Sequence, residues 1–438
     1  MDEPKHFEQL YPKETREAEL KKIIEILKSG RSAQIVGLPG IGKGSTLRLL
    51  PYNREVRELH LGKDEPKFHF VYMDFSEVRG RSFFEVFKFI FISLSYSLSE
   101  RGFSEEQKVV NDNLREALEF TDDLILFQGL KKSVDFLAVE KGLYLVFLFD
   151  RFEDYIPNID ERFFLNLKIL RNRIKYNFLA VFSVARPIED VLEVPLFAEF
   201  YEYIVGNIVY LQIEAGVGLT FRFNYLEEVT GKKADSKARK EIERLTGGHA
   251  KIAKLAYESV LAADKKPENL EKFLLESKQV RGALYEVWNY LTPEEQIDIR
   301  EGSVNEFLEK VGLLKGITIQ IPLLKSYVST LPANQANLNL VYDPAKNEIK
   351  KGDESLTDKL TPSEFKLLRF LMTNTDRVCE KDEIIQNVWK DSKTQEGVSD
   401  QALDQIIYRL RKKIEEDPNN PTFIQTVKGR GYKFNPLP

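Results

Sequence analysis

A glycine-rich segment near the amino end has the residue types needed to hold a phosphate group. It has the sequence GLPGIGKGST and follows an apolar run that ends at Val36. Glycines let backbone N–H groups turn towards an anion, and the helix that follows adds the positive end of its dipole. A lysine in such a loop reaches the β- and γ-phosphates of a nucleotide. We therefore predict a nucleotide-binding loop formed by Gly37, Gly40, Gly42, Lys43, Gly44, Ser45 and Thr46.

The loop departs from the usual pattern at the position after its lysine. The pattern GxxxxGK[ST] has a magnesium-binding hydroxyl there, whereas this chain has Gly44, followed by Ser45 and Thr46. The form GxPGxGKG[ST] is similar to the loop of adenylate kinases, which leaves a nucleotide kinase as one alternative. We expect Mg²⁺ to be held through water, or Ser45 to replace the missing hydroxyl.

A second set of polar residues follows an apolar run at 144–149. Asp150 ends this run and is placed to hold hydrated Mg²⁺, as a Walker B aspartate does. Many ATPases have a glutamate next, but this chain has Arg151. Glu153 is our candidate for polarising water, and the alternative is a solvated charge at a helix start.

A third candidate follows the apolar run at 178–182. Arg186 comes shortly after it and is a candidate catalytic sensor of the γ-phosphate. The alternative is a surface arginine before a proline turn.

The elements that must position these residues alternate between helical stretches and short apolar runs. Such alternation predicts buried parallel strands with flanking helices, the α/β fold of a P-loop NTPase. The runs are 33–36, 68–73, 143–149 and 178–184, with a fifth at 204–213.

These features together resemble the STAND class of signalling ATPases and their Orc/Cdc6-like AAA+ relatives, over roughly residues 7–331. Besides the loop, the resemblance is carried by TREAEL at 15–20, FE after Asp150, SVARP at 183–187 and LTGGHA at 245–250. It implies ATP, ADP and Mg²⁺ as cofactors, with a closed ADP form and an open, oligomerising ATP form. We expect a slow ATPase that acts as a switch, and Gly44 and Arg151 leave its efficiency open.

Residues 338–438 closely resemble the OmpR/PhoB-type winged-helix DNA-binding domain. The motif LTPSEFKLL at 360–368 begins the first helix, and RVCEKDEII at 377–385 leads into the second. The motif IQTVKGRGYKF at 424–434 is typical of the hairpin that forms the wing. The resemblance implies duplex DNA as the partner.

The third helix of this segment has two stripes of different character. The core stripe consists of Leu403, Ile407, Leu410 and Ile414. The other stripe can enter a major groove, with Gln405 suited to adenine, Arg409 to guanine or phosphate, and Ile406 to a thymine methyl. Its members are Ala402, Gln405, Ile406 and Arg409.

Basic residues flank this stripe. Arg411, Lys412 and Lys413 can neutralise phosphates, and the wing adds Lys428 and Arg430, of which Arg430 can enter the minor groove. Gln401 replaces an arginine typical of the family, so one phosphate contact is in question. The alternatives are a solvated basic helix end and a protein-docking surface.

The chain therefore divides into five expected parts. They are a P-loop NTPase domain (1–213), a helical lid (214–279), a winged-helix-like domain (280–331), a linker (332–337) and the DNA-binding winged helix (338–438).

Composition limits the function further. The single cysteine excludes an internal disulfide, and four scattered histidines do not suggest a zinc site. The amino end has no targeting pattern and no stretch is apolar enough for a membrane, so we expect a cytoplasmic protein. The net charge of -5 requires any DNA surface to be local.

Our leading hypothesis is a transcription regulator whose nucleotide state controls oligomerisation and DNA binding. The alternative is a signalling or defence switch whose winged helix binds a protein partner. The operator and the activating ligand or protein are not identified by the sequence.

Overall fold

The computed structural model describes residues 6–213, 216–263, 265–331, 340–343, 347–352, 354–375, 377–389, 400–415, 418, 421–427 and 429–435. Contacts between Cα atoms divide the chain into two compact units, residues 1–328 and residues 329–438. The predicted linker at 332–337 lies outside the described residues. The finer domain boundaries remain predictions.

A five-stranded parallel sheet forms the centre of the first unit. The strand order is β2-β3-β4-β1-β5, and every neighbouring pair is parallel. The strands are β1 (Ala33–Val36), β2 (Phe68–Asp74), β3 (Tyr144–Asp150), β4 (Phe178–Val184) and β5 (Ile208–Tyr210). Strands β1 and β4 are buried along their whole length, as expected for strands covered on both faces. The predicted α/β fold of a P-loop NTPase is confirmed.

The fifth strand is shorter than the run at 204–213 that predicted it. Residues Tyr201–Ile204 form the short helix α10, and Gly206 then turns the chain with a φ of +74°. Only Ile208–Tyr210 pairs with β1. The spacing of apolar residues does not reveal the turn at Gly206, and for this reason the sequence predicted a longer strand.

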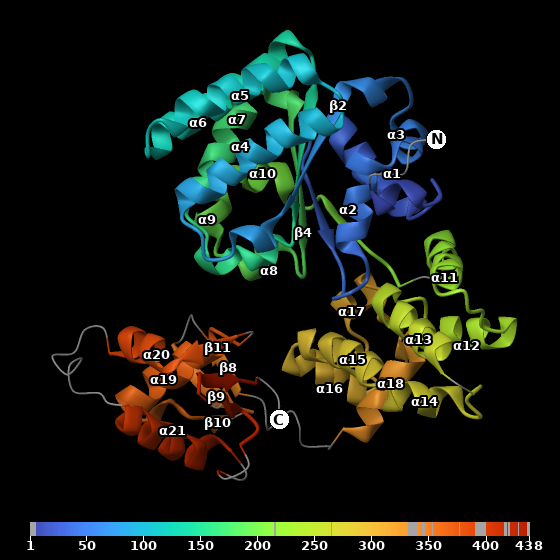
Figure 1. The fold of residues 1–438 in the computed structure, drawn as a ribbon, viewed down its shortest axis with the longest axis vertical. Coiled ribbons are helices and arrows are strands. Elements are labelled where there is room, and N and C mark those ends of the chain that lie inside the picture. Colours follow the sequence, from blue (N-terminus) through green and yellow to red (C-terminus); the bar gives the residue numbers. More distant parts are fainter. Residues whose placement is uncertain are drawn as a thin grey trace. The chain divides into compact units, whose positions relative to one another are not determined.

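Helices cover both faces of the sheet. Figure 1 shows α4, α6 and α7 on one side of the strands and α1 and α2 on the other. The helices of this region are α1 (Glu17–Lys28), α2 (Lys43–Tyr52), α3 (Arg54–Leu61), α4 (Phe83–Glu100), α5 (Ser104–Leu118), α6 (Asp123–Asp135), α7 (Arg162–Ile174), α8 (Ile188–Val191) and α9 (Val194–Phe197). Among the described helices, none combines the length and the apolar character needed to cross a membrane.

Parallel register brings three segments to one edge of the sheet. Val36 is the register partner of Val184, and Phe149 is the partner of Phe182. The glycine-rich loop, Asp150 and the segment after β4 therefore leave the sheet at the same edge. This edge is the carboxyl end of the strands, where ligands of open α/β sheets bind.

A helical region follows the sheet, as predicted. Its helices are α11 (Val217–Thr230), α12 (Ser236–Thr246), α13 (Ala250–Ala262) and α14 (Leu270–Glu276). The Asp235 side chain caps α12 by accepting the N–H of Ala238. Gly247 ends α12 in a left-handed conformation, and a Cβ atom there would overlap the carbonyl oxygen of Gln320. Only glycine fits this position.

Residues 278–330 add four helices and a small hairpin. The elements are α15 (Lys278–Tyr290), α16 (Pro293–Glu301), α17 (Glu306–Lys310), β6 (Leu314–Lys315), β7 (Thr318–Ile319) and α18 (Pro322–Thr330). Thr292 and Glu295 form a capping box at the start of α16. Strand β7 has only two residues and pairs with β6 in an antiparallel hairpin.

The second unit is an α+β winged helix. Its elements are β8 (Leu340–Asp343), β9 (Glu348–Lys351), β10 (Glu354–Ser355), α19 (Pro362–Met372), β11 (Val378–Glu380), α20 (Lys381–Val388), α21 (Asp400–Ile414), β12 (Ile424–Val427) and β13 (Gly431–Phe434). Strands β12 and β13 form the predicted wing, and β11 pairs with β13. The sequence did not predict β10 or β11, because both are only two or three residues long.

Two glycines of the wing offer a matched test of this packing. A Cβ atom on Gly431 would overlap the carbonyl oxygen of Cys379, whereas nothing lies within 4 Å of one on Gly429. Both residues have positive φ. We predict that Gly431→Ala destabilises the second unit by about 3 kcal/mol, and Gly429→Ala by about 1 kcal/mol. Hydrogen exchange of the β11–β13 amides measures both, and equal protection in the two variants would contradict the predicted clash.

Candidate functional site

The glycine-rich loop has the geometry of an anion-binding turn. Gly40 and Gly42 have φ values of +73° and +104°, and α2 begins directly afterwards at Lys43. The Lys43 ammonium donates to the carbonyl of Gly37 at 2.8 Å. Burial lowers the pKa of Lys43. The loop thus presents its lysine beside the first turn of a helix, where the helix dipole favours anions.

A cavity of about 450 Å³ opens beside the loop. It is large enough for a nucleoside, and its walls come from the loop, the amino-terminal segment and the helical region. The hydroxyl of Thr15 is buried at this cavity without a hydrogen-bond partner. The walls include Tyr11, Thr15, Arg16, Ile41, Ser45, Thr46, Val217, Leu219, Arg222, Gly248 and Lys251.

Two loop hydroxyls lie on the side of this cavity. Thr46 donates to the carbonyl of Gly42 at 2.9 Å, as helix hydroxyls often do. Ser45 lines the cavity and is half-buried. Its role as a magnesium ligand stays a prediction.

Asp150 is held at both of its carboxylate oxygens. It ends β3 with 3% of its surface exposed. Oδ1 accepts the N–H of Arg151 at 2.9 Å, and Oδ2 accepts the hydroxyl of Tyr72 at 2.7 Å. Burial and the Asp150 charge raise the pKa of Tyr72, so the phenol stays protonated. A Cβ atom on Gly44 would overlap Oδ2, so the carboxylate lies against the first turn of α2.

Glu153 lies in the short 3-10 helix that follows Asp150. Its Oε2 atom is buried without a hydrogen-bond partner. Burial raises the pKa of Glu153, and the Lys43 ammonium acts in the opposite direction. Unpaired buried carboxylate oxygens are rare in folded proteins, so this atom is a candidate contact for water or for a ligand. Its catalytic role stays a prediction.

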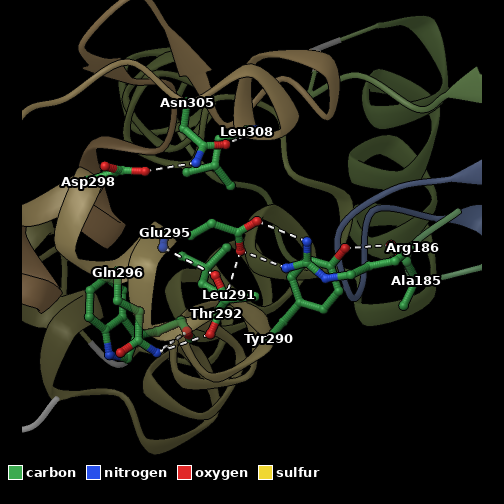
Figure 2. Close-up of polar contacts among 11 residues, drawn as sticks. Ala185, Arg186, Tyr290, Leu291, Thr292, Glu295, Gln296, Asp298, Asn305 and Leu308 are labelled. Atoms are coloured by element: carbon green, nitrogen blue, oxygen red, sulfur yellow. Dashed lines mark hydrogen bonds and ion pairs between the residues drawn. The ribbon is translucent and has the colours of Figure 1, made fainter. Parts of the chain in front are cut away.

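Arg186 points towards α16. Its guanidinium donates to both oxygens of Glu295, at 2.9 and 2.6 Å, in a bidentate ion pair (Figure 2). The rings of Tyr290 and Phe307 lie 4.9 and 4.4 Å from the guanidinium. The Tyr290 hydroxyl donates to the carbonyl of Ala185 at 2.5 Å. The predicted phosphate sensor is therefore bonded to α16 in this structure.

The helical region is docked onto the glycine-rich loop. His249 accepts the N–H of Ile252 through Nδ1, so Nε2 carries the proton and donates to the carbonyl of Pro39 at 2.9 Å. Burial lowers the pKa of His249 to about 4, which keeps the ring neutral. The N–H of Lys251 donates to the carbonyl of Gly40 at 3.0 Å. The start of α13 is thus fixed against the loop.

Helix α21 presents the two predicted stripes. The core stripe of Leu403, Ile407, Leu410 and Ile414 is buried, which confirms it. On the other stripe, Gln405 and Arg409 are exposed and Ile406 packs partly against the core. Ala402 is half-buried at the same face. Base contacts from these residues remain a prediction.

The basic residues that flank this stripe differ in whether their side chains are hydrogen-bonded within the unit. Arg411 donates to the carbonyl of Ile424 at 3.0 and 2.6 Å and to the hydroxyl of Thr426 at 2.8 Å. Lys413 donates to the Glu364 carboxylate at 2.6 Å. Lys412 is exposed, with its ammonium 4.8 Å from the ring of Tyr408.

The wing contributes one exposed arginine. Arg430 lies in the turn between β12 and β13, where its N–H donates to the carbonyl of Val427. Lys428 lies outside the described residues. Glu415, which follows α21, accepts the N–H groups of Thr422, Phe423 and Ile424 and so joins the helix to the wing.

Sequence reasoning missed several residues that shape the site. No local pattern indicated that Tyr72 pairs with Asp150 or that Glu295 pairs with Arg186, since the partners lie 78 and 109 positions apart. The Arg16 guanidinium donates to the carbonyls of Ile41 and Gln212; the TREAEL motif included Arg16 but did not indicate these contacts. Within the described residues no group of three or more His, Cys, Asp or Glu side chains is arranged around a metal.

The second unit is similar in sequence to known transcriptional regulators. Residues 357–434 match the family described as "Transcriptional regulatory protein, C terminal". PetR of Rhodobacter capsulatus is 31% identical over 148 residues, which are 32% of this chain and 62% of PetR. PhoB of Escherichia coli, a phosphate regulon transcriptional regulatory protein, is 29% identical over 144 residues, which are 32% of this chain and 60% of PhoB. The chain thus spans about three fifths of the length of these relatives.

A solved structure resembles the chain along its whole length at low similarity. Cdc6p of Pyrobaculum aerophilum has a TM-score of 0.38 and 13% identity, over 100% of this chain and 91% of that one. The fold assignment of the first unit depends on its own sheet order and loop geometry. This chain therefore joins a P-loop NTPase fold to an OmpR/PhoB-type winged-helix DNA-binding domain of the transcriptional regulatory family.

Proposed function

We propose that this chain is an ATP-binding transcription regulator, in which the nucleotide controls oligomerisation and duplex DNA binding by the second unit. One observation carries the proposal: a phosphate-binding loop beside a nucleoside-sized cavity and a transcription-regulator domain belong to one chain. The proposal places the protein in the cytoplasm, because DNA is its partner. The activating ligand or protein is left open.

The first unit would bind ATP or ADP across the loop and the cavity. Phosphates would meet the loop N–H groups and the Lys43 ammonium, while the base and ribose would occupy the cavity beside Thr15. Asp150 fits a hydrated Mg²⁺, because this ion typically takes one or two carboxylates together with phosphate oxygens. When bound, Mg²⁺ would neutralise charge on the phosphates. Glu153 would polarise water for slow hydrolysis.

Lys43→Ala tests nucleotide binding. Because it removes a charge-assisted contact to phosphate, we predict that the Kd for ATP rises about 10- to 100-fold. Lys63→Ala, an exposed lysine of the same unit, serves as the control and should leave the Kd unchanged. Isothermal titration calorimetry measures both, and equal Kd values would refute the loop's role.

Arg186 offers a physical route from nucleotide state to domain arrangement. It leaves β4 at the sheet edge where the glycine-rich loop begins, and α16 holds it through Glu295. Burial raises the pKa of the Tyr290 phenol; the neighbouring Arg186 lowers it, and the carboxylates of Glu295 and Glu153 raise it further. A γ-phosphate at Lys43 would compete with Glu295 for the guanidinium. ATP would then weaken the hold on residues 278–330, and ADP would leave it in place.

Glu295→Gln tests this competition. Glutamine keeps a capping-box residue at this position but removes the charge that attracts Arg186. We predict that the variant oligomerises at a lower ATP concentration than the wild type, measured by light scattering in ATP and in ADP. Glu294→Gln, the exposed neighbour on α16, should behave like the wild type. A wild-type response from Glu295→Gln would contradict the route through Arg186.

Oligomerisation would matter for DNA because a single winged helix buries only a modest surface. Of the predicted DNA contacts that the structure describes, Gln405, Arg409 and Lys412 on α21 and Arg430 on the wing are exposed. Arg411 and Lys413 would act mainly by fixing β12 and α19 to the recognition helix.

Arg409 and Arg411 form a matched pair for testing the DNA surface. We predict that Arg409→Ala weakens duplex binding about tenfold without loss of stability, because its side chain is exposed. Arg411→Ala should instead lower the thermal stability of the second unit, since it removes three hydrogen bonds to β12. Fluorescence anisotropy at several salt concentrations and thermal unfolding measure the two effects. Unchanged affinity in Arg409→Ala would contradict the surface.

The engagement of Arg411 and Lys413 within the fold favours one other candidate, a winged helix that binds a protein in a signalling or defence switch. Contacts to DNA phosphates release counterions, so the affinity for DNA falls steeply as the salt concentration rises; a protein contact does not show this steep dependence.

Genome-wide mapping of bound DNA with Lys43 intact or replaced tests the whole proposal. If the occupied DNA sites are the same with and without ATP, and the same with Lys43 intact or replaced, control of DNA binding by the nucleotide is rejected.

A further inference from the structure

The Asp150 carboxylate is in contact with three groups that fix its orientation. Oδ2 of Asp150 accepts the Tyr72 hydroxyl at 2.7 Å, and Oδ1 accepts the backbone N–H of the next residue at 2.9 Å. A Cβ atom on Gly44 would overlap Oδ2. A serine or threonine at position 44, as in the common loop pattern, would thus bring its Cβ atom into the carboxylate.

Tyr72 is itself fixed by the helix that carries the loop. The Arg48 guanidinium lies 5.8 Å from the centre of the Tyr72 ring, and the Tyr52 ring lies 6.3 Å away, edge-on. Arg48 and Tyr52 are four residues apart on α2, so they share one helix face. Arg48 is held in turn by Glu8 at 2.7 Å. The Tyr72 hydroxyl therefore keeps a set position relative to both β3 and α2.

We infer that Tyr72 is a positioning residue, which orients Asp150 towards hydrated Mg²⁺ on a bound nucleotide, and that Gly44 is required to leave room for this carboxylate. The inference rests on the proposed ATP binding. Mg²⁺ demands near-ideal octahedral geometry, so a carboxylate that holds its waters must be fixed in orientation. Outer hydrogen bonds of this kind set the orientation of metal-binding carboxylates.

The magnesium gain, defined as the Kd for ATP in EDTA divided by the Kd in excess Mg²⁺, tests the inference without measuring hydrolysis. Calorimetry on the full chain gives both values. We predict that Tyr72→Phe lowers the magnesium gain about tenfold while the Kd in EDTA stays unchanged, because phenylalanine keeps the ring and loses only the hydroxyl. Tyr52→Phe removes a hydroxyl from the adjacent ring and should keep the wild-type gain.

A double-mutant cycle makes the assignment specific. Asp150→Asn should remove most of the magnesium gain, and adding Tyr72→Phe to it should cause no further loss, because the hydroxyl acts through the carboxylate. Additive losses would overturn the inference, as would an unchanged gain in Tyr72→Phe. A wild-type protein that binds ATP equally well with and without Mg²⁺ would overturn it as well.

Gly44→Ala provides a second variant should Tyr72→Phe fail to fold. The added methyl group must displace a carboxylate that is held at both oxygens, so the magnesium gain should fall here too. An unchanged magnesium gain in Gly44→Ala would refute the claim that position 44 must be glycine to leave space for the Asp150 carboxylate.

The experiment also separates a failure of this inference from a failure of the proposed function. If the wild type binds no ATP in either buffer, the proposed function itself fails. If it shows a magnesium gain that Tyr72→Phe retains, only the present inference fails.

Discussion

The nucleotide site depends on the parallel register of β1, β3 and β4. Val36 lies opposite Val184, and Phe149 lies opposite Phe182, so three strands end side by side. The segments that follow are far apart in the chain, and each alone carries only one polar feature. Because parallel strands end at the same edge, the sheet brings loop, carboxylate and arginine together. No single segment could assemble this site.

Close packing then sets which residue types the site can use. The Asp150 carboxylate lies so near α2 that Gly44 admits no side chain, and Tyr72 holds the carboxylate there. On the other side of the loop, His249 and the N–H of Lys251 bond to carbonyls of Pro39 and Gly40. The loop is therefore fixed by both the sheet and the helical region.

In the second unit, internal bonds decide which charges remain available. Arg411 and Lys413 belong to the basic end of α21, yet both are bonded within the unit. Glu415 accepts three backbone N–H groups of the segment that leads into β12. These bonds fix the wing to the recognition helix. The exposed face is consequently narrower than a count of lysines and arginines implies.

The sequence by itself determined the longer elements and their buried faces. The loop motif, the strands at 33–36 and 178–184, and the core stripe of α21 follow from local pattern, because periodicity and turn chemistry are properties of neighbouring residues. Only the tertiary structure decided the partners of the polar groups. Tyr72 meets Asp150 across 78 positions, and Arg186 meets Glu295 across 109. Such pairs depend on how whole elements pack, and a local pattern carries no information about which distant residue will face it.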